Sequence, residues 1–318
     1  MGYGIGGHLG IARQNSFGTA STSWDFVPII SESLVTNIEA LISETIQGRY
    51  EEGASYPGLL TVTGDVVFEP DPIMMGHFLK GVTGMSSGTL ATSATNWIFQ
   101  PSQTDFDDTT ALPPYSLQVY RSTGLAWFFQ DAVINKLSVN IKAGSVVRAT
   151  ASIMARVSSL GAKSVASYLS GDPYRWNQAS YSAAGAANGD LEDLTITIDN
   201  GVEGVTFLDG TLAHGKYKRT GYRKSTISGT MDFSTQSQYA VFRQSSRQPM
   251  VLTLTGDNIG GAAVNLLKFD MPEVRYSSFP IAMGGPGRVT VGFDGTLKYN
   301  ASSACAIRMT MTNTRTSY

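Results

Sequence analysis

The chain has few of the residues from which metal and redox sites are usually made. Its single cysteine, Cys305, rules out a disulfide within the chain and a cysteine-only metal site. The three histidines, His8, His77 and His214, are far apart, and none stands at a metal-ligand spacing from a carboxylate or another histidine. We therefore expect no cofactor and no metal. The alternating apolar neighbours of Cys305 favour a buried thiol.

Charged residues and long apolar runs are also scarce. Only 15% of the residues are charged, below the usual quarter of a soluble domain. Low charge is typical of surfaces that face other subunits, although an ordinary low-charge β protein has the same composition. No apolar run is long enough to cross a bilayer. The first residues lack the charged and apolar regions of a signal peptide, so we expect a protein that is made in a cytoplasm and makes no membrane contact.

The two halves of the chain differ in charge. Residues 1–157 carry 8 Lys and Arg against 13 Asp and Glu, which gives −5. Residues 158–318 carry 15 against 12, which gives +3. Neither half is basic enough to indicate a dedicated nucleic-acid binder.

Alternation of apolar and polar residues is the main structural signal. It runs through residues 60–68 and 305–312, and a period of two indicates strands with one buried face. Comparable runs occur at 115–120, 137–142, 147–155, 250–255 and 288–294. The pattern predicts an all-β protein of antiparallel strands with short flanking helices.

Five elements recur in the same order in the two halves. Residues 62–68 match residues 227–233, with Gly and Phe coinciding. A short helix signal follows each match, with Asp71 capping the first helix, Pro72 at its first position and Ser234 capping the second. The three strand pairs that come next are 115–119 with 250–254, 137–141 with 267–271, and 147–151 with 289–293. We interpret the chain as two tandem antiparallel β-sandwich or barrel units, residues 1–157 and 190–318.

Residues 34–46 test this duplication. Their apolar residues fit a helical stripe better than a strand. The corresponding stretch of the second unit, Leu194–Ile198, alternates cleanly, and the duplication therefore predicts a strand at 34–46 as well.

Two segments without strong periodicity lie between these elements. Residues 158–189 are rich in Ser, Ala and Gly and are expected to be the linker between the units. Residues 85–113 form a long expected loop that carries Asp105, Asp107 and Asp108. Long loops without secondary structure are uncommon and are often functional, so these aspartates are candidate contact residues.

The sequence contains no enzyme-site motif together with the strands and helices that such a motif requires. Gly2–Gly7 satisfies the dinucleotide-binding pattern, but no strand can precede it and no βαβ unit follows. No nucleophile-elbow pattern surrounds any serine. We expect no enzymatic activity.

One basic cluster is present, formed by Lys216, Lys218, Arg219, Arg223 and Lys224. Interleaving by Tyr217 and Tyr222 would suit nucleic-acid contact. A solvated hairpin or a contact with an acidic neighbouring subunit is the simpler explanation, and we expect the cluster to lie at a subunit junction.

Four short motifs in order resemble the tail tube proteins of long-tailed bacteriophages. They are the segments 10–20, with an aromatic-Gly-Thr-Ala step, 26–34, Gln47-Gly48-Arg49, and 64–68 before a short helix. The resemblance implies a β-sandwich or barrel with a flanking helix, assembled as stacked rings around a DNA channel, and a structural protein of the virion tail. It implies as partners the tape measure protein and then DNA in the lumen, and the tail terminator and tail tip proteins. It carries no catalytic residues.

Relatives with one unit per chain build six-membered rings, so two units per chain favour a trimeric ring with pseudo-sixfold order. A homohexamer is the alternative. We further expect a lumen lined by acidic and neutral polar side chains, because basic rings would retard DNA. The competing interpretation is a β-rich binding module of a fibre or carbohydrate-recognition protein, but the four tryptophans are scattered and form no obvious platform.

Overall fold

The computed structural model describes residues 4–84, 86–90, 94–103, 112–122, 124–169, 171–283 and 285–318. Nearly all of its regular structure is antiparallel β-sheet, as predicted. The first half contains η1 (Gly4–Gly6), β1 (His8–Arg13), β2 (Asp25–Val27), β3 (Ile29–Glu32), β4 (Val35–Ile42), β5 (Ser55–Phe68), α1 (Met75–Thr83), β6 (Ser87–Leu90), β7 (Thr95–Phe99), β8 (Tyr115–Tyr120), β9 (Ala126–Lys142) and β10 (Arg148–Ala155). Then follow β11 (Val157–Gly161), η2 (Trp176–Gln178), β12 (Ala179–Ala183), β13 (Ala186–Ala187), β14 (Leu191–Asp199), β15 (Val202–Val205), β16 (Lys216–Arg219), β17 (Lys224–Asp232), α2 (Ser237–Arg243), β18 (Gln248–Gly260), β19 (Ala263–Ser278), β20 (Thr290–Leu297) and β21 (Arg308–Asn313).

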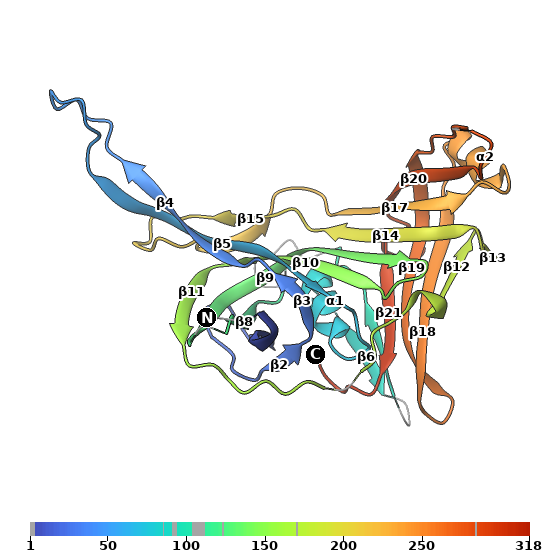
Figure 1. Cartoon of the computed structure of the whole chain (residues 1–318), viewed down its shortest axis with the longest axis horizontal. Helices are drawn as coiled ribbons and strands as arrows, with labels where there is room; N and C mark the ends of the chain where they lie inside the picture. The colour runs from blue at the N-terminus through green and yellow to red at the C-terminus, as the bar shows by residue number, and fades with distance from the viewer. Residues whose placement is uncertain are drawn as a thin grey trace.

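The two halves pair their strands in the same order. In the first half β5 pairs with β10, β10 with β9, and β9 with β8. In the second half β17 pairs with β20, β20 with β19, and β19 with β18. A helix follows the first strand of each set (Figure 1). The four recurring strands of the sequence thus occupy corresponding places in the sheets, and the recurring helix follows the same strand in each half.

Strand β9 belongs to two layers of the first half. Its beginning pairs with β8 and β11, and its end pairs with β10 and β14. The change occurs around Asp131, whose backbone has a φ of 54°. The buried carboxylate of Asp131 accepts a hydrogen bond from the Gly18 backbone N–H at 2.7 Å. A local irregularity of this kind bends a strand and lets it join two sheets.

The halves are joined edge to edge. Residues 193–199 of β14 pair with residues 136–142 of β9, so one sheet continues from the first half into the second. β21 near the end of the chain pairs with β7 of the first half. The segment 158–189, expected as a linker, contains most of β11 together with η2 and β12, and Tyr174 within it is buried. The division into units at this segment stays a prediction.

The segment 85–113 is not one long loop. It contains β6 and β7, and β7 lies between β6 and β21. Trp97 and Phe99 of β7 belong to the hydrophobic core. The prediction missed β7 because five residues are too few to give a clear periodic signal beside a stretch rich in Ser and Thr.

The short helices are close to their predicted positions. α1 begins at Met75 rather than at Pro72, and the Asp71 carboxylate accepts hydrogen bonds from the N–H groups of Ile73 and Met74 in the preceding turn. Phe78 of α1 stacks on Phe68 of β5 with ring centroids 4.0 Å apart. No helix among the described residues is long and apolar enough to span a bilayer.

Candidate assembly surfaces

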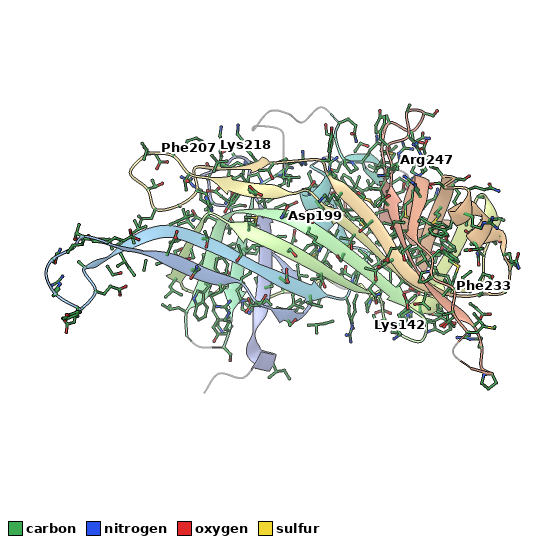
Figure 2. All side chains as sticks on the ribbon, turned by 90° about the horizontal axis from the view of Figure 1, so that it is seen from above. Lys142, Asp199, Phe207, Lys218, Phe233 and Arg247 are labelled. Atoms are coloured by element: carbon green, nitrogen blue, oxygen red, sulfur yellow. The ribbon has the colours of Figure 1, made fainter. Side chains whose placement is uncertain are left out.

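The continuous sheet has one buried and one polar face. Strands β5, β10, β9, β14, β17 and β20 lie side by side in this order. Alternate residues such as Val139, Ile196 and Ile227 are buried in the core. Figure 2 views the sheet from above. The opposite face carries Ser, Thr and Asn side chains and as many charged ones, among them Asp65, Arg148, Thr150, Ser152, Lys136, Ser138, Asn140, Lys142, Asp193, Thr195, Thr197, Asp199, Lys224, Thr226, Ser228, Thr230, Asp232 and Asp294.

Lysines on this polar face lie opposite acids. Lys142 is in register with Asp193, and Lys136 with Asp199. Between them Asn140 donates to the Thr195 hydroxyl at 2.8 Å, and the Ser138 and Thr197 hydroxyls are hydrogen-bonded at 2.9 Å. Lys224 is also in register with Asp199, whereas Arg148 lies opposite the neutral Asn140. Opposite charges in neighbouring strands attract each other, so the three lysines of this polar face are compensated locally.

A long hairpin projects from one edge of the sheet. β4 pairs with β5 from Val35 opposite Thr63 to Ile42 opposite Ser55, and residues 43–54 connect them. Figure 1 shows the hairpin pointing away from the body of the protein. We call residues 35–63 the arm and residues 43–54 its tip. The strand predicted at 34–46 is confirmed over Val35–Ile42.

The arm exposes apolar side chains on both of its faces. Ile46 and Tyr50 at the tip are fully exposed. Five large apolar residues along its strands are also exposed, namely Val35, Ile38, Leu41, Ile42 and Tyr56. β4 is an edge strand, which is a template for pairing with another chain unless it is covered. Contiguous exposed apolar surface of this kind marks an interaction site. The helical stripe seen in the sequence at 34–46 was the trace of this two-sided apolar pattern.

The second half supports the base of the arm. The Leu60 backbone N–H donates to the Leu212 carbonyl at 2.7 Å, and Leu60 forms an isolated bridge with Ala213. Leu212 and Ala213 belong to the connection between β15 and β16, and Arg156 donates to the His214 carbonyl at 2.7 Å in the same connection. The direction of the arm is therefore fixed by residues of both halves.

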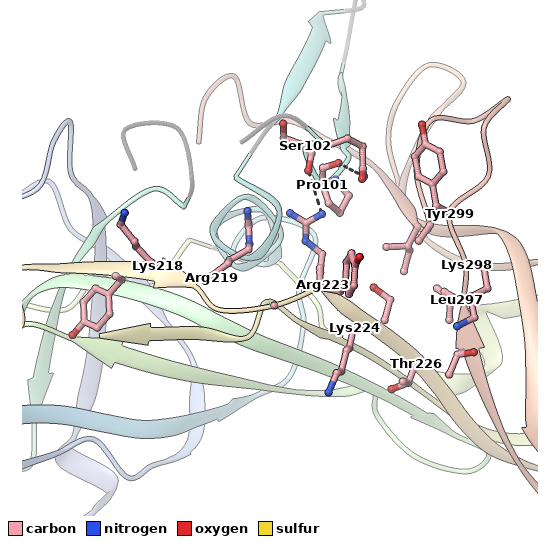
Figure 3. Close-up of a pocket in the computed structure, with 18 residues that line it drawn as sticks. Pro101, Ser102, Lys218, Arg219, Arg223, Lys224, Thr226, Leu297, Lys298 and Tyr299 are labelled. Atoms are coloured by element: carbon pink, nitrogen blue, oxygen red, sulfur yellow. Dashed lines mark hydrogen bonds between the residues drawn. The ribbon is translucent and has the colours of Figure 1, made fainter. Parts of the chain in front are cut away.

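The basic cluster lines a groove of about 870 Å³ (Figure 3). Lys218, Arg219, Arg223 and Lys224 contribute to its walls, together with Lys298 near the end of β20. Lys216 does not line the groove, because its ammonium lies over the Phe207 ring, 5.4 Å from the ring centroid. Asp105, Asp107 and Asp108 lie outside the described residues.

A buried asparagine fixes two of these cations. Asn200 donates through its side-chain amide to the Val82 carbonyl of α1 at 2.9 Å and to the Asn135 carbonyl of β9 at 3.2 Å. Its Oδ1 accepts from Arg223 at 3.0 Å and from Arg219 at 3.3 Å. Asn200 follows β14 directly, so the cluster is tied to both halves of the protein.

The histidines form no metal site. Among the described residues no group of three or more His, Cys, Asp and Glu side chains could hold a metal ion. His77 instead lies buried beside Asp25, with its Nε2 2.9 Å from the carboxylate, which also accepts a hydrogen bond from Arg315. Burial lowers the pKa of His77 below 6.5 despite the hydrogen bond to Asp25. The Cys305 thiol is buried, as its apolar neighbours indicated.

The structure thus presents a projecting hairpin with exposed apolar side chains, a polar sheet face and a basic groove. A family model described as phage tail tube protein matches residues 4–299 of the 318 residues. The chain belongs to this family. Membership implies a structural, non-enzymatic component of the bacteriophage tail that assembles into a tube. No curated protein matches the chain.

Of the surfaces of this tail tube protein, the sequence indicated only the basic cluster. The arm was missed as a site, since exposed apolar residues cannot be told from core residues in a sequence. Lys298 of the groove was also missed, because it stands 74 residues after Lys224 and only the pairing of β20 with β17 brings the two together.

Proposed function

We propose that this protein polymerises as stacked rings into a tail tube and that DNA passes through the lumen on its way into the host. The observation that carries the proposal is the continuous sheet across both halves, with one face that is polar and locally charge-compensated. Lys and Arg contacts with DNA phosphates bind tightly at moderate salt. A lumen lined by this face would offer hydroxyls, amides and paired charges, and DNA would slide along it.

In the proposed assembly each ring contains three chains. Two units per chain would then give six units in pseudo-sixfold order, and the charges of −5 and +3 of the halves would alternate around the ring. Such complementarity selects the partner more than it raises affinity. The head-to-tail stacking of rings is a heterologous contact that does not close, and it therefore generates a filament.

The arm is the proposed contact between neighbouring chains. Its exposed apolar side chains and its open edge would be covered in the tube. In the segment 85–113, β7 is part of the core. The inter-ring contact of Asp105, Asp107 and Asp108 stays a prediction.

The proposed partners beyond the ring are the tape measure protein and later DNA in the lumen, and the terminator and tip proteins at the tube ends. Assembly would take place in the host cytoplasm.

Electron microscopy of the purified protein tests the proposal. We expect tubes with threefold symmetry and pseudo-sixfold order. Sixfold symmetry would refute the trimer and leave the tube intact, whereas dispersed particles under all conditions, including addition of tail tip complexes as nuclei, would refute tube formation.

A further inference from the structure

The arm loses the support of the sheet close to its base. β5 pairs with β10 only as far as Val62, which lies opposite Ala155. Two residues further out, the Leu60 N–H donates to the Leu212 carbonyl on the side of β5 that faces away from β4. From Leu60 to Ser55 the strand continues for roughly 17 Å at about 3.3 Å per residue. Over this length β5 is paired, among the described residues, with β4 alone.

This length makes the arm a lever. Neighbouring strands are rotated by about 10–35° relative to each other, and by more in two-stranded ribbons, so the direction of a free ribbon varies. A rotation of about 20° at Leu60 would displace Ser55 by about 6 Å over a length of roughly 17 Å, and the tip by more. An isolated two-stranded hairpin is also only marginally stable in water. A contact made by the tip therefore requires a support that fixes the direction of the arm.

The connection between β15 and β16 is a compact hairpin that can give this support. We call residues 206–215 the brace. The His214 ring lies against Gly204 of β15, and the Phe207 ring lies against Gly215. A Cβ at either glycine would overlap the ring that faces it. The two rings therefore pack directly on backbone, which leaves the brace little room to move.

One arginine joins the brace to the body. Arg156 stands between β10 and β11 and donates through Nε to the His214 carbonyl at 2.7 Å. Its Nη1 lies 3.5 Å from one carboxylate oxygen of the buried Asp131. The other oxygen of Asp131 accepts the hydrogen bond from Gly18, at the point where β9 passes from one layer to the other. Arg156 thus connects the base of the arm to the place where the two layers of the first half meet.

We propose that the brace, held by Arg156, sets the direction of the arm and thereby makes the tip available to a neighbouring chain. The inference rests on the proposed tube and adds positioning residues to it, namely Arg156, Leu212 and Ala213. The brace belongs to the second half and Asp131 to the first, so the arm takes this direction only when both halves have folded. Incompletely folded subunits would then be excluded from the growing tube.

The direction of the arm can be measured in the free subunit. Spin labels on Gln47→Cys in the tip and Ser159→Cys in β11 report the distance between arm and body, since both positions are exposed and the native thiol Cys305 is buried. Val205 and Lys216 are in register, so Asn-Gly can replace the brace as a two-residue hairpin turn. We expect a narrow distance distribution with the brace and a broad one after this replacement. An equally narrow distribution would overturn the proposal.

Tube elongation provides a second readout. If the freed arm points in the required direction about a tenth of the time, tubes should elongate about tenfold more slowly. Arg156→Gln should broaden the distance distribution and slow elongation as well. Arg148→Gln, which removes an exposed arginine of β10 outside the brace, is the matched control and should change neither. Circular dichroism and thermal unfolding establish that each variant is folded.

The outcomes separate the brace from the tube itself. A broad distribution combined with normal elongation would show that assembly does not depend on the direction of the arm, and it would overturn the proposal. A broad distribution in the protein with an intact brace would overturn it too. Failure of the wild type to form any tube would refute the proposed function, whereas the distances in the free subunit would still decide whether the brace holds the arm.

Discussion

The side-chain oxygen of Asn200 accepts a hydrogen bond from Nε of Arg223 at 3.0 Å, at a point where Asn200 is completely buried. The same side chain donates to the Val82 carbonyl of α1. A cation of the groove is thus held by a residue that also fixes the helix of the first half.

Replacing Asn200 by Ala should destabilise the protein by about 2 kcal/mol, because the loss leaves buried hydrogen-bonding groups without a partner. Urea unfolding measures the change. Asn37→Ala, at an exposed position of the arm, should stay within about 0.5 kcal/mol of the wild type. Equal stability of the two variants would contradict the role of Asn200.

Acid should weaken the fold in two stages. Burial lowers the pKa of His77, so its stability contribution is complete above its unfolded value of 6.5 and decreases as the pH falls below it. Burial opposes ionisation of Asp25, but hydrogen bonds from His77 and Arg315 outweigh it and lower its pKa to about 2. The contribution of Asp25 is therefore complete above 3.8 and decreases as the pH falls from there toward 2.

Urea unfolding at a series of pH values checks both stages. His77→Gln should reduce the loss of stability that begins below pH 6.5, to which His8 and His214 also contribute because burial lowers their pKa values. Asp25→Asn should reduce the loss below pH 3.8. An unchanged pH profile in His77→Gln would show that another group is responsible for the first stage.

The Tyr318 ring covers α1 at Gly76. A Cβ at Gly76 would lie 2.2 Å from the ring, although Ala is otherwise the better helix former. Gly76→Ala should therefore destabilise the protein by about 1–3 kcal/mol through overpacking. Adding Tyr318→Leu should restore part of the loss in thermal unfolding, whereas Gly189→Ala, where nothing lies within 4 Å, should change little. A fully stable Gly76→Ala would argue against this packing.

Shortening the arm should block assembly without unfolding the subunit. Ile42 and Ser55 are paired, so Asn-Gly can replace residues 43–54 as a two-residue hairpin turn. We expect an unchanged melting temperature and no tubes by electron microscopy. Deleting residues 86–108 is not an equivalent experiment, since it removes β7 and should unfold the protein. Normal tubes formed by the variant with the shortened arm would refute the proposal that the arm joins neighbouring chains.

Positive charge on the polar sheet face should slow DNA and leave assembly intact. Thr150→Lys/Thr230→Lys places two additional cations per chain on this face, and Thr150→Gln/Thr230→Gln is the matched neutral control. Tails should assemble equally with both. DNA ejection from particles with lysine tails should be slower, and the difference should shrink at high salt as counterions screen the contacts. Equal ejection times would place this face away from the lumen.

The sequence by itself determined the class of the fold. Strand alternation depends on which side chains are apolar, and it located β5, β8, β10 and β20 within a few residues. The match of residues 62–68 with 227–233 corresponds to strands with the same pairing order. The ordered motifs near the start of the chain indicated the family that the comparison confirmed.

Tertiary structure alone decided how the halves meet and which apolar residues stay outside. The pairing of β14 with β9 joins residues more than fifty positions apart, and no local pattern encodes such a partner. Ile38 lies in a strand of the first half and Ile196 in a strand of the second half. The Ile38 residue is 55% exposed, whereas Ile196 in the core is 1% exposed. The difference arises because β4 extends past the edge of the body, where no second layer covers it, while β14 lies between β9 and β17 with the core on one face.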